Sequence, residues 1–143
     1  VGAGVRSVAA TPQIIVSKDP NCGCCSGWVD HLRSAGFDAE VRELSDLGPL
    51  KQRLGVPSML ASCHTAEIEG FVIEGHVPAS AIRRLLAERP PSIGLAVPGM
   101  PVGSPGMEVP GTPSETYEVV LFDPAGQRVF ARYQGTKELR SGL

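Results

Sequence analysis

Hydrophobic and polar residues follow two different periods along the first ninety residues of the chain. Short apolar runs and strict alternation indicate strands, whereas apolar positions three and four residues apart indicate helices. Strands are expected at residues 13–17, 37–44, 56–63 and 68–73, and helices at residues 26–35, 46–54 and 78–88. The last two strands would form an antiparallel hairpin. The predicted order is therefore strand, helix, strand, helix, strand, strand, helix.

Beyond residue 90 the pattern changes, because proline and glycine interrupt it. Residues 92–113 are rich in both, so they are expected to contain neither a regular helix nor a central strand. Alternation returns at 117–122 and 128–133, on either side of the turn-forming run Asp123-Pro124-Ala125-Gly126, which predicts a β-hairpin. We expect a flexible N-terminal segment (1–12), a core (13–89) and an extension packed on it (90–143), making one domain overall.

Composition narrows the classes of function. The chain has 143 residues, of which 42% are hydrophobic and 20% charged, as expected for a globular domain. The net charge is −2, and the Lys and Arg residues are dispersed, so nucleic acid is not expected as a partner. No apolar stretch approaches the roughly 20 residues that span a bilayer. Because the chain begins at Val1 without Met, we expect an exported protein whose signal peptide has been removed.

Three of the four cysteines lie close together where the first helix is expected to begin. Cys22 and Cys25 have the C-x-x-C spacing of a redox or metal-binding pair, but Cys24 adds a sulfur that a dithiol switch does not need. Adjacent thiolates fit awkwardly on one tetrahedral ion, so Cys24 and Cys25 favour bridging between several metal ions. Monovalent copper suits such soft ligands best.

Three alternatives remain for the cysteines. A structural disulfide could join Cys22 to Cys25, or one of these to Cys63, in an exported protein. A thiol-disulfide oxidoreductase would use Cys22 as the attacking sulfur, with a pKa lowered by the helix N-terminus, and Cys25 as the resolving one. A zinc site of Cys22, Cys25, Cys63 and a histidine would leave Cys24 without a role.

Two of the three histidines are candidate copper ligands. His64 follows Cys63 directly, and a solvated turn histidine is the equally weighted alternative. His76 lies in the loop before the helix at 78–88, where a capping role is the alternative. His31 falls on the first helix, and we expect it at the surface.

Two of the three methionines are also candidate copper ligands. Met100 and Met107 lie in the segment rich in proline and glycine, where they either pin the loop to the core or offer thioether sulfur to monovalent copper. Met59 falls inside the predicted strand 56–63 and is expected in the core.

The predicted order of elements resembles the thioredoxin fold over residues 13–89. The resemblance depends on the C-x-x-C at the start of the first helix and on Gly55-Val56-Pro57 before the third strand. It implies an α/β, thioredoxin-like fold, followed here by a Pro/Gly-rich loop and a β-hairpin extension. It further implies that Pro57 is cis and lies beside residues 22–25, and Cys63 is expected to approach the same side.

Several separate motifs carry a more specific resemblance. They are Lys18-Asp19-Pro20-Asn21-Cys22-Gly23-Cys24-Cys25, Ser62-Cys63-His64-Thr65-Ala66, Glu74-Gly75-His76-Val77-Pro78, Gly94-Leu95-Ala96-Val97-Pro98-Gly99-Met100-Pro101 and Gly103-Ser104-Pro105-Gly106-Met107-Glu108. With these motifs the chain resembles the CopG family of bacterial copper-resistance proteins over about residues 13–133.

This resemblance implies a periplasmic protein that binds a multinuclear copper cluster. Cys22, Cys24 and Cys25 would bridge the copper ions, and Cys63 would be the fourth sulfur. His64, His76, Met100 and Met107 match motif positions, and their softness and placement make them further candidate ligands. The implied partners are copper ions and other periplasmic copper-handling proteins. The same ligands would serve a copper oxidoreductase, interconverting monovalent and divalent copper, or a copper buffer.

Overall fold

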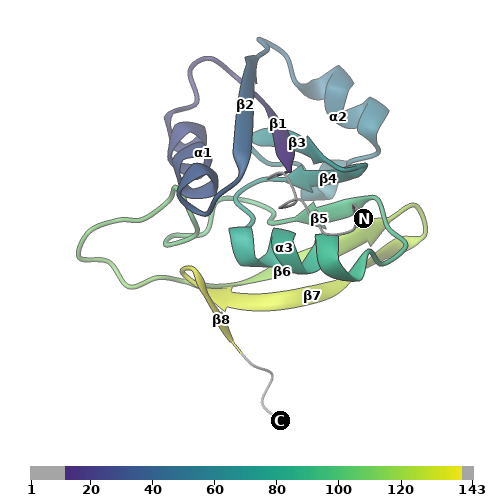
Figure 1. The fold of residues 1–143 in the computed structure, drawn as a ribbon. Coiled ribbons are helices and arrows are strands. Elements are labelled where there is room, and N and C mark those ends of the chain that lie inside the picture. The colour runs from purple at the N-terminus through teal and green to yellow at the C-terminus, as the bar shows by residue number, and fades with distance from the viewer. Residues whose placement is uncertain (1–11, 140–143) are drawn as a thin grey trace, which may run out of the picture.

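An eight-stranded sheet runs through residues 12–139, the part of the chain that the computed structural model describes (Figure 1). The strand order across the sheet is β2-β1-β3-β4-β5-β6-β7-β8. The strands are β1 (Gln13–Lys18), β2 (Asp38–Glu43), β3 (His64–Ile68), β4 (Phe71–Glu74), β5 (Gly94–Ala96), β6 (Thr116–Asp123), β7 (Gly126–Gln134) and β8 (Lys137–Leu139). The pairs β1–β2 and β4–β5 are parallel, and the other neighbours are antiparallel.

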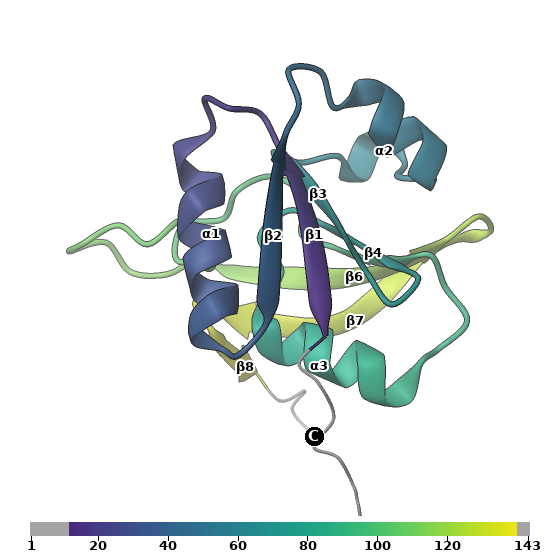
Figure 2. The ribbon, with the colours of Figure 1, turned by 45° about the horizontal axis from the view of Figure 1, so that its top comes forward.

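Three α-helices of the described residues pack on this sheet: α1 (Gly23–Ser34), α2 (Gly48–Leu54) and α3 (Ala79–Glu88). Helices α1 and α3 contribute to the larger core, α1 through Trp28 and Leu32, and α3 through Ile82 and Leu85. These pairs have the helical spacing of three or four residues that places them on one face. Figure 2 shows α1 alongside β2 and β1, with α2 set apart from α1 and α3. The predicted order of the first seven elements is confirmed.

The prediction of a strand at 56–63 is wrong. Residues 58–60 form a 3₁₀ turn, η2 (Ser58–Leu60), and the strand begins only at His64. Val56 and Leu60, on either side of the extended Pro57, both enter a smaller core. Met59, expected in the core, points away from it and is 72% exposed. A hairpin is confirmed, but β3 begins at residue 64 instead of 56, and β4 begins at residue 71 instead of 68.

The expectation of a cis bond at Pro57 is also wrong, because no peptide bond in the described residues is cis. Pro57 is extended, with φ −64° and ψ 141°, and begins η2. Its carbonyl accepts a hydrogen bond from the Leu60 amide at 2.9 Å. Pro57 therefore starts a turn rather than a strand.

The segment 92–113 contains a central strand that its composition argued against. Strand β5 is fully buried and pairs with β4 on one side and β6 on the other. Gly94 permits this close approach, because a Cβ there would lie 1.7 Å from the Val72 carbonyl oxygen. The remainder of the segment forms no helix or strand, as predicted.

The C-terminal hairpin is confirmed as β6 and β7, and a short strand that the pattern did not predict, β8, continues it. Through β5 the hairpin joins the same sheet as β1–β4, and Tyr117, Leu121 and Tyr133 enter the same core as α1 and α3.

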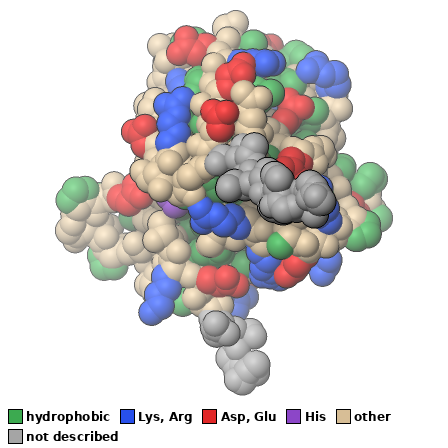
Figure 3. Space-filling model, in the orientation of Figure 1, with side chains coloured by type: hydrophobic (Ala, Val, Ile, Leu, Met, Phe, Trp, Pro, Cys, Tyr) green, Lys and Arg blue, Asp and Glu red, His purple; other side chains and the backbone are tan. Residues whose placement is uncertain are grey.

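The segment predicted to be flexible, 1–12, lies outside the described residues except for Pro12. None of the helices in residues 12–139 has the length and apolarity needed to cross a membrane. Figure 3 shows acidic and basic side chains interspersed on one face.

A buried ion pair fixes the chain just before β3. Glu74, at the end of β4, is completely buried and pairs with Lys51 of α2. Its carboxylate also accepts hydrogen bonds from the Ser62 amide and the Thr65 hydroxyl, each at 2.7 Å. Every oxygen of this buried carboxylate therefore has a donor, and the turn that carries Cys63 is tied to β4.

Replacing Lys51 with methionine should destabilise the protein strongly, since it leaves the Glu74 carboxylate buried without its counter-charge. We expect the free energy of unfolding to fall by about 3–5 kcal/mol, measured by urea denaturation at neutral pH. The control is Arg42→Met, which breaks the exposed ion pair with Glu40 and should cost no more than about 1 kcal/mol. Equal losses in the two variants would contradict this account.

Candidate metal centre

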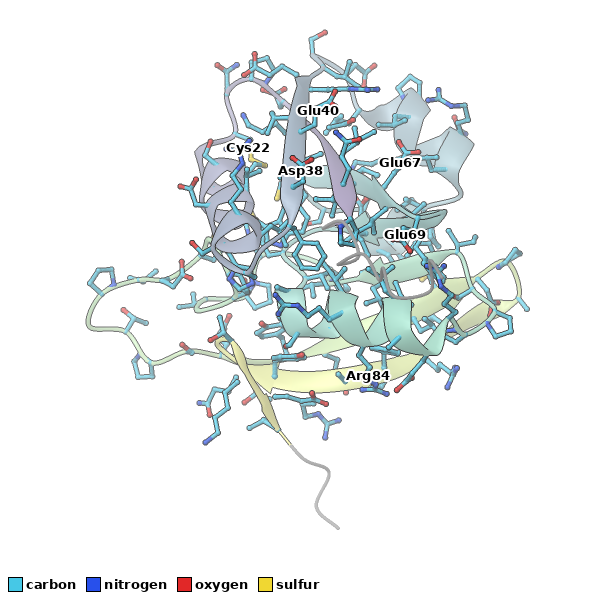
Figure 4. All side chains as sticks on the ribbon, in the orientation of Figure 1. Cys22, Asp38, Glu40, Glu67, Glu69 and Arg84 are labelled. Carbon is cyan, nitrogen blue, oxygen red and sulfur yellow. A yellow bond between two sulfur atoms is a disulfide. The ribbon has the colours of Figure 1, made fainter. Side chains whose placement is uncertain are left out.

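The cysteine loop lies where β1 passes into α1. Cys22 is the N-cap of α1, in extended conformation, and its amide donates to the Asp19 carbonyl at 3.0 Å. Cys24 and Cys25 follow in the first turn of the helix. Cys22 and Cys25 form a disulfide, and the sulfur of Cys24 lies 3.5 Å from that of Cys22. Figure 4 shows Cys22 at the start of α1.

Cys63 reaches this loop from a distant part of the sequence. It immediately precedes β3, which runs antiparallel to β1 with Lys18 opposite His64. The end of β1 and the start of β3 therefore meet at one end of the sheet. The four sulfurs of Cys22, Cys24, Cys25 and Cys63 all lie within 4.8 Å of one another, and we call them the four-sulfur group. The expected approach of Cys63 to the cysteine loop is confirmed.

Two fully buried histidines turn a ring nitrogen toward these sulfurs. His64 Nε2 lies 2.8 Å from the Gly75 carbonyl oxygen, and His76 Nδ1 lies 2.6 Å from that of Pro105. A carbonyl only accepts hydrogen bonds, so these two nitrogens carry the protons. The unprotonated nitrogens are then His64 Nδ1 and His76 Nε2. His64 Nδ1 lies 3.3 Å from Cys25 Sγ and 3.4 Å from Cys63 Sγ. His76 Nε2 lies 3.1 Å from Cys63 Sγ. Imidazoles held in this way by a backbone carbonyl are typical of metal ligands.

Burial keeps these groups uncharged. It lowers the pKa of His64 to about 3, with a further contribution from the neighbouring His76. Burial also lowers the pKa of His76. The pKa of Cys63 is raised to about 11, first by burial and then by the charge of Cys24. At neutral pH both imidazoles are therefore neutral, as metal binding requires, and a metal ion at Cys63 would displace the thiol proton.

Met100, one of the two candidate methionines, lies beside the cysteines. Its sulfur lies 3.6 Å from Cys24 Sγ, and its side chain is 48% exposed. The loop is held there by Ser62, whose hydroxyl donates to the Gly99 carbonyl at 2.9 Å. Met107 lies half-buried farther along the same loop, where its backbone bonds to Gly103 and Ser104. For Met107 the assignment as a ligand stays a prediction.

The third histidine is not at the surface as expected. His31 is half-buried, and its Nε2 accepts a hydrogen bond of 3.0 Å from the amide of Ala79, the first residue of α3. Burial lowers its pKa, which keeps this nitrogen free to accept. His31 therefore caps α3 and joins it to α1.

Two residues important to the geometry were not singled out from the sequence. The Trp28 ring stacks on the His64 ring with centroids 4.2 Å apart, and its Nε1 donates to the Val77 carbonyl at 2.8 Å. Gly106 docks the C-terminal extension on α1, because a Cβ there would lie 2.7 Å from the Trp28 amide nitrogen and 2.9 Å from the Cys24 carbonyl oxygen. The presence of Gly106 in one of the motifs given above was the available signal.

The comparisons with known proteins agree with this picture. A family model described as a protein of unknown function, DUF411, matches residues 60–107. No curated protein matches the chain. Two solved structures of copper resistance protein CopG are similar, Form 1 with 47% identity and a TM-score of 0.80, and Form 2 with 46% and 0.81. Each alignment covers 86% of this chain and 98% of the solved one.

This chain belongs to the CopG family. The resemblance inferred from the motifs is thus confirmed, and the mixed α/β architecture matches that of the CopG structures. The matched segment 60–107 contains Cys63, both buried histidines and both loop methionines, whereas the C-x-C-C run of this CopG member lies outside it.

Replacing Gly106 with alanine should disturb both stability and the candidate site. The new Cβ would meet backbone atoms of α1, and the φ of +93° is unfavourable for alanine. We expect a larger loss of unfolding free energy than for Gly111→Ala, together with altered NMR shifts of the His76 ring. Gly111 is a matched control in the same loop, with a φ of +80° and no atom within 4 Å of the position that a Cβ would take, and should lose about 1–2 kcal/mol. Similar urea midpoints for the two variants would disprove the close docking.

Proposed function

We propose that this protein binds copper in bacterial copper resistance and holds a multinuclear cluster of monovalent copper. The observation that carries the proposal is the four-sulfur group, with every sulfur within 4.8 Å of the others. Soft thiolates favour monovalent copper over harder ions. The names of the similar solved structures, copper resistance protein CopG, support the same metal.

Several ions fit this ligand set better than one. Cys24 and Cys25 are adjacent in sequence and cannot easily serve one tetrahedral ion together with Cys22 and Cys63, so bridging thiolates account for all four sulfurs. His64 and His76 supply ligands from the buried side, where their free nitrogens lie 3.1–3.4 Å from Cys63 Sγ. Met100 supplies one from the exposed side, 3.6 Å from Cys24. Met107 is a further candidate in the same loop.

The disulfide supports a redox role in which monovalent and divalent copper are interconverted. Cys22 and Cys25 can exist as two thiolates or as the disulfide described above. Two divalent copper ions would each take one electron as the two thiolates join, which gives two monovalent ions and one disulfide. A dithiol donor would return two electrons and two protons to the cysteine pair.

The remaining assignments extend this proposal. A thioredoxin-like core at 13–89 is supported by the strand order β2-β1-β3-β4 and by the position of the cysteine pair at the start of α1. Residues 90–143 would be an extension of that core, with Pro105 and Gly106 completing the site. We further propose a periplasmic location, with other periplasmic copper-handling proteins as partners.

A second candidate is a thiol-disulfide oxidoreductase of thioredoxin type. The specific observation is that the Cys22–Cys25 disulfide lies at the N-terminus of the 12-residue helix α1, with Cys22 as N-cap. The positive end of a helix dipole stabilises a thiolate formed there. In this function Cys22 would attack and Cys25 would resolve, while Cys24 would be dispensable.

Anaerobic titration of the fully reduced protein with monovalent copper tests the first candidate. We expect more than one copper ion per chain to be retained after desalting, because several thiolates bridge neighbouring ions. Cys24→Ser should retain fewer, whereas Ser26→Ala, an exposed change in the same helix, should behave as wild type. Absence of tightly held copper in the wild type would overturn the proposal. Disulfide exchange that survives in Cys24→Ser and disappears in Cys22→Ser would then support the oxidoreductase.

The redox step can be tested separately with divalent copper. Adding two equivalents to the reduced, metal-free protein without oxygen should abolish the EPR signal of divalent copper. Alkylation followed by mass spectrometry should then find the Cys22–Cys25 disulfide, with Cys24 and Cys63 still alkylated. A Cys22→Ser/Cys25→Ser variant should preserve most of the EPR signal, since it lacks the electron-donating pair. A persistent signal in the wild type would count against interconversion.

A further inference from the structure

We propose that Cys63, His64 and His76, here called the triad, hold one monovalent copper ion of the proposed cluster even when the Cys22–Cys25 disulfide is closed. The inference rests on the proposed copper function and specifies how that function depends on the state of the cysteine pair. Oxidation of Cys22 and Cys25 would lower the number of copper ions held to one, rather than release them all.

The donor atoms of the triad are already gathered while the disulfide is present. Cys63 Sγ lies 3.4 Å from His64 Nδ1 and 3.1 Å from His76 Nε2, and all three donors lie within 4.8 Å of one another. In a trigonal site with about 2.3 Å from the ion to sulfur and about 2.0 Å from the ion to nitrogen, the sulfur and each nitrogen lie about 3.7 Å apart. The observed separations require only small side-chain movements to reach this geometry.

The anchors of the triad do not involve the cysteine pair. The Ser62 amide, next to Cys63, donates to the buried carboxylate of Glu74 at 2.7 Å. His64 is held by the Gly75 carbonyl at 2.8 Å and His76 by the Pro105 carbonyl at 2.6 Å. Closing or opening the disulfide removes none of these bonds, so the three donors keep their positions in both states.

Closing the disulfide removes ligands from the four-sulfur group but none from the triad. A disulfide converts two strong thiolate ligands into sulfurs with little affinity for metal, so the bridged cluster loses half of its four sulfurs. The triad keeps one thiolate and two neutral imidazoles, a set that suits copper. Stacking of Trp28 on His64 covers one side of this site, and the half-buried Cys63 leaves an approach for the ion.

Metal counting in two states of the full chain tests this inference. Monovalent copper is added anaerobically to the disulfide form and to the fully reduced form, excess metal is removed, and copper per chain is measured. Alkylation with mass spectrometry verifies that the disulfide stays closed. We expect about one copper ion per chain in the disulfide form and several in the reduced form. X-ray absorption of the disulfide form should show two nitrogen neighbours and one sulfur neighbour around copper.

Variants locate the ion without any change of redox state. Cys22→Ser/Cys25→Ser, which cannot form the disulfide, should also retain about one copper ion per chain. Cys63→Ser and His76→Gln should lose it from the disulfide form. His31→Gln, which changes the histidine that caps α3, should retain it. Circular dichroism checks folding, and the X-ray absorption measurement on wild type requires no variant.

The outcomes separate this inference from the proposed function. The triad is overturned if the disulfide form holds no copper, or holds copper with only sulfur neighbours, as expected from Cys24 and Met100. Several copper ions in the reduced form would still support the cluster. A reduced form without copper overturns the proposed function. If the disulfide form nevertheless binds one ion with nitrogen neighbours, the triad stands without the cluster.

Discussion

The antiparallel pairing of β1 with β3 is the constraint on which the candidate site depends. It sets Lys18 opposite His64, so the end of β1 and the start of β3 lie side by side. The cysteine loop follows the first of these strands, and Cys63 precedes the second. Because strand register fixes which residues face one another, a shift of this pair would separate Cys63 from the C-x-C-C run. Four sulfurs from two segments meet for this reason.

Backbone carbonyls and one buried carboxylate then determine the details of the site. The carbonyls of Gly75 and Pro105 fix the protonated nitrogen of each buried histidine and thereby direct the other nitrogen to sulfur. Glu74 holds the turn before Cys63 through the Ser62 amide. These partners come from β4, from the loop after it and from the C-terminal extension, so distant parts of the chain complete one site. Such fixed partners reduce the reorganisation needed when a ligand binds.

The site also has an inner and an outer side. His64 and His76 are fully buried, Cys63 and Cys24 are partly buried, and about half of Met100 is exposed. Soft donors therefore extend from the solvent to the core within a few ångströms of one another. Under the proposed function, a copper ion would pass between these donors by exchanging one ligand at a time. The disulfide lies close to donors of both kinds, with Cys22 Sγ 3.5 Å from Cys24 Sγ and Cys25 Sγ 3.3 Å from His64 Nδ1.

The sequence by itself determined the order of the first seven elements, the C-terminal hairpin, the concentration of cysteines at the start of α1 and membership of the CopG family. These features depend on local periodicity and on contiguous motifs. It did not determine where β3 begins, that Met59 is exposed, that Pro57 is trans or that β5 crosses the centre of the sheet. Short apolar runs bounded by proline or glycine fit a turn or a strand equally well, and neighbouring strands decide between them.

Only the tertiary structure decided which candidate ligands meet. Cys63, His64 and His76 were expected near the cysteine loop, but their separations depend on β-strand register. The orientation of the histidine rings depends on carbonyls that the one-dimensional pattern does not connect to them. The docking of Gly106 on α1, and with it the position of Pro105 beside His76, depends on a close backbone approach between segments far apart in the chain. Sequence patterns indicate which kind of local element a segment forms, whereas contacts between distant segments arise from packing the whole sheet.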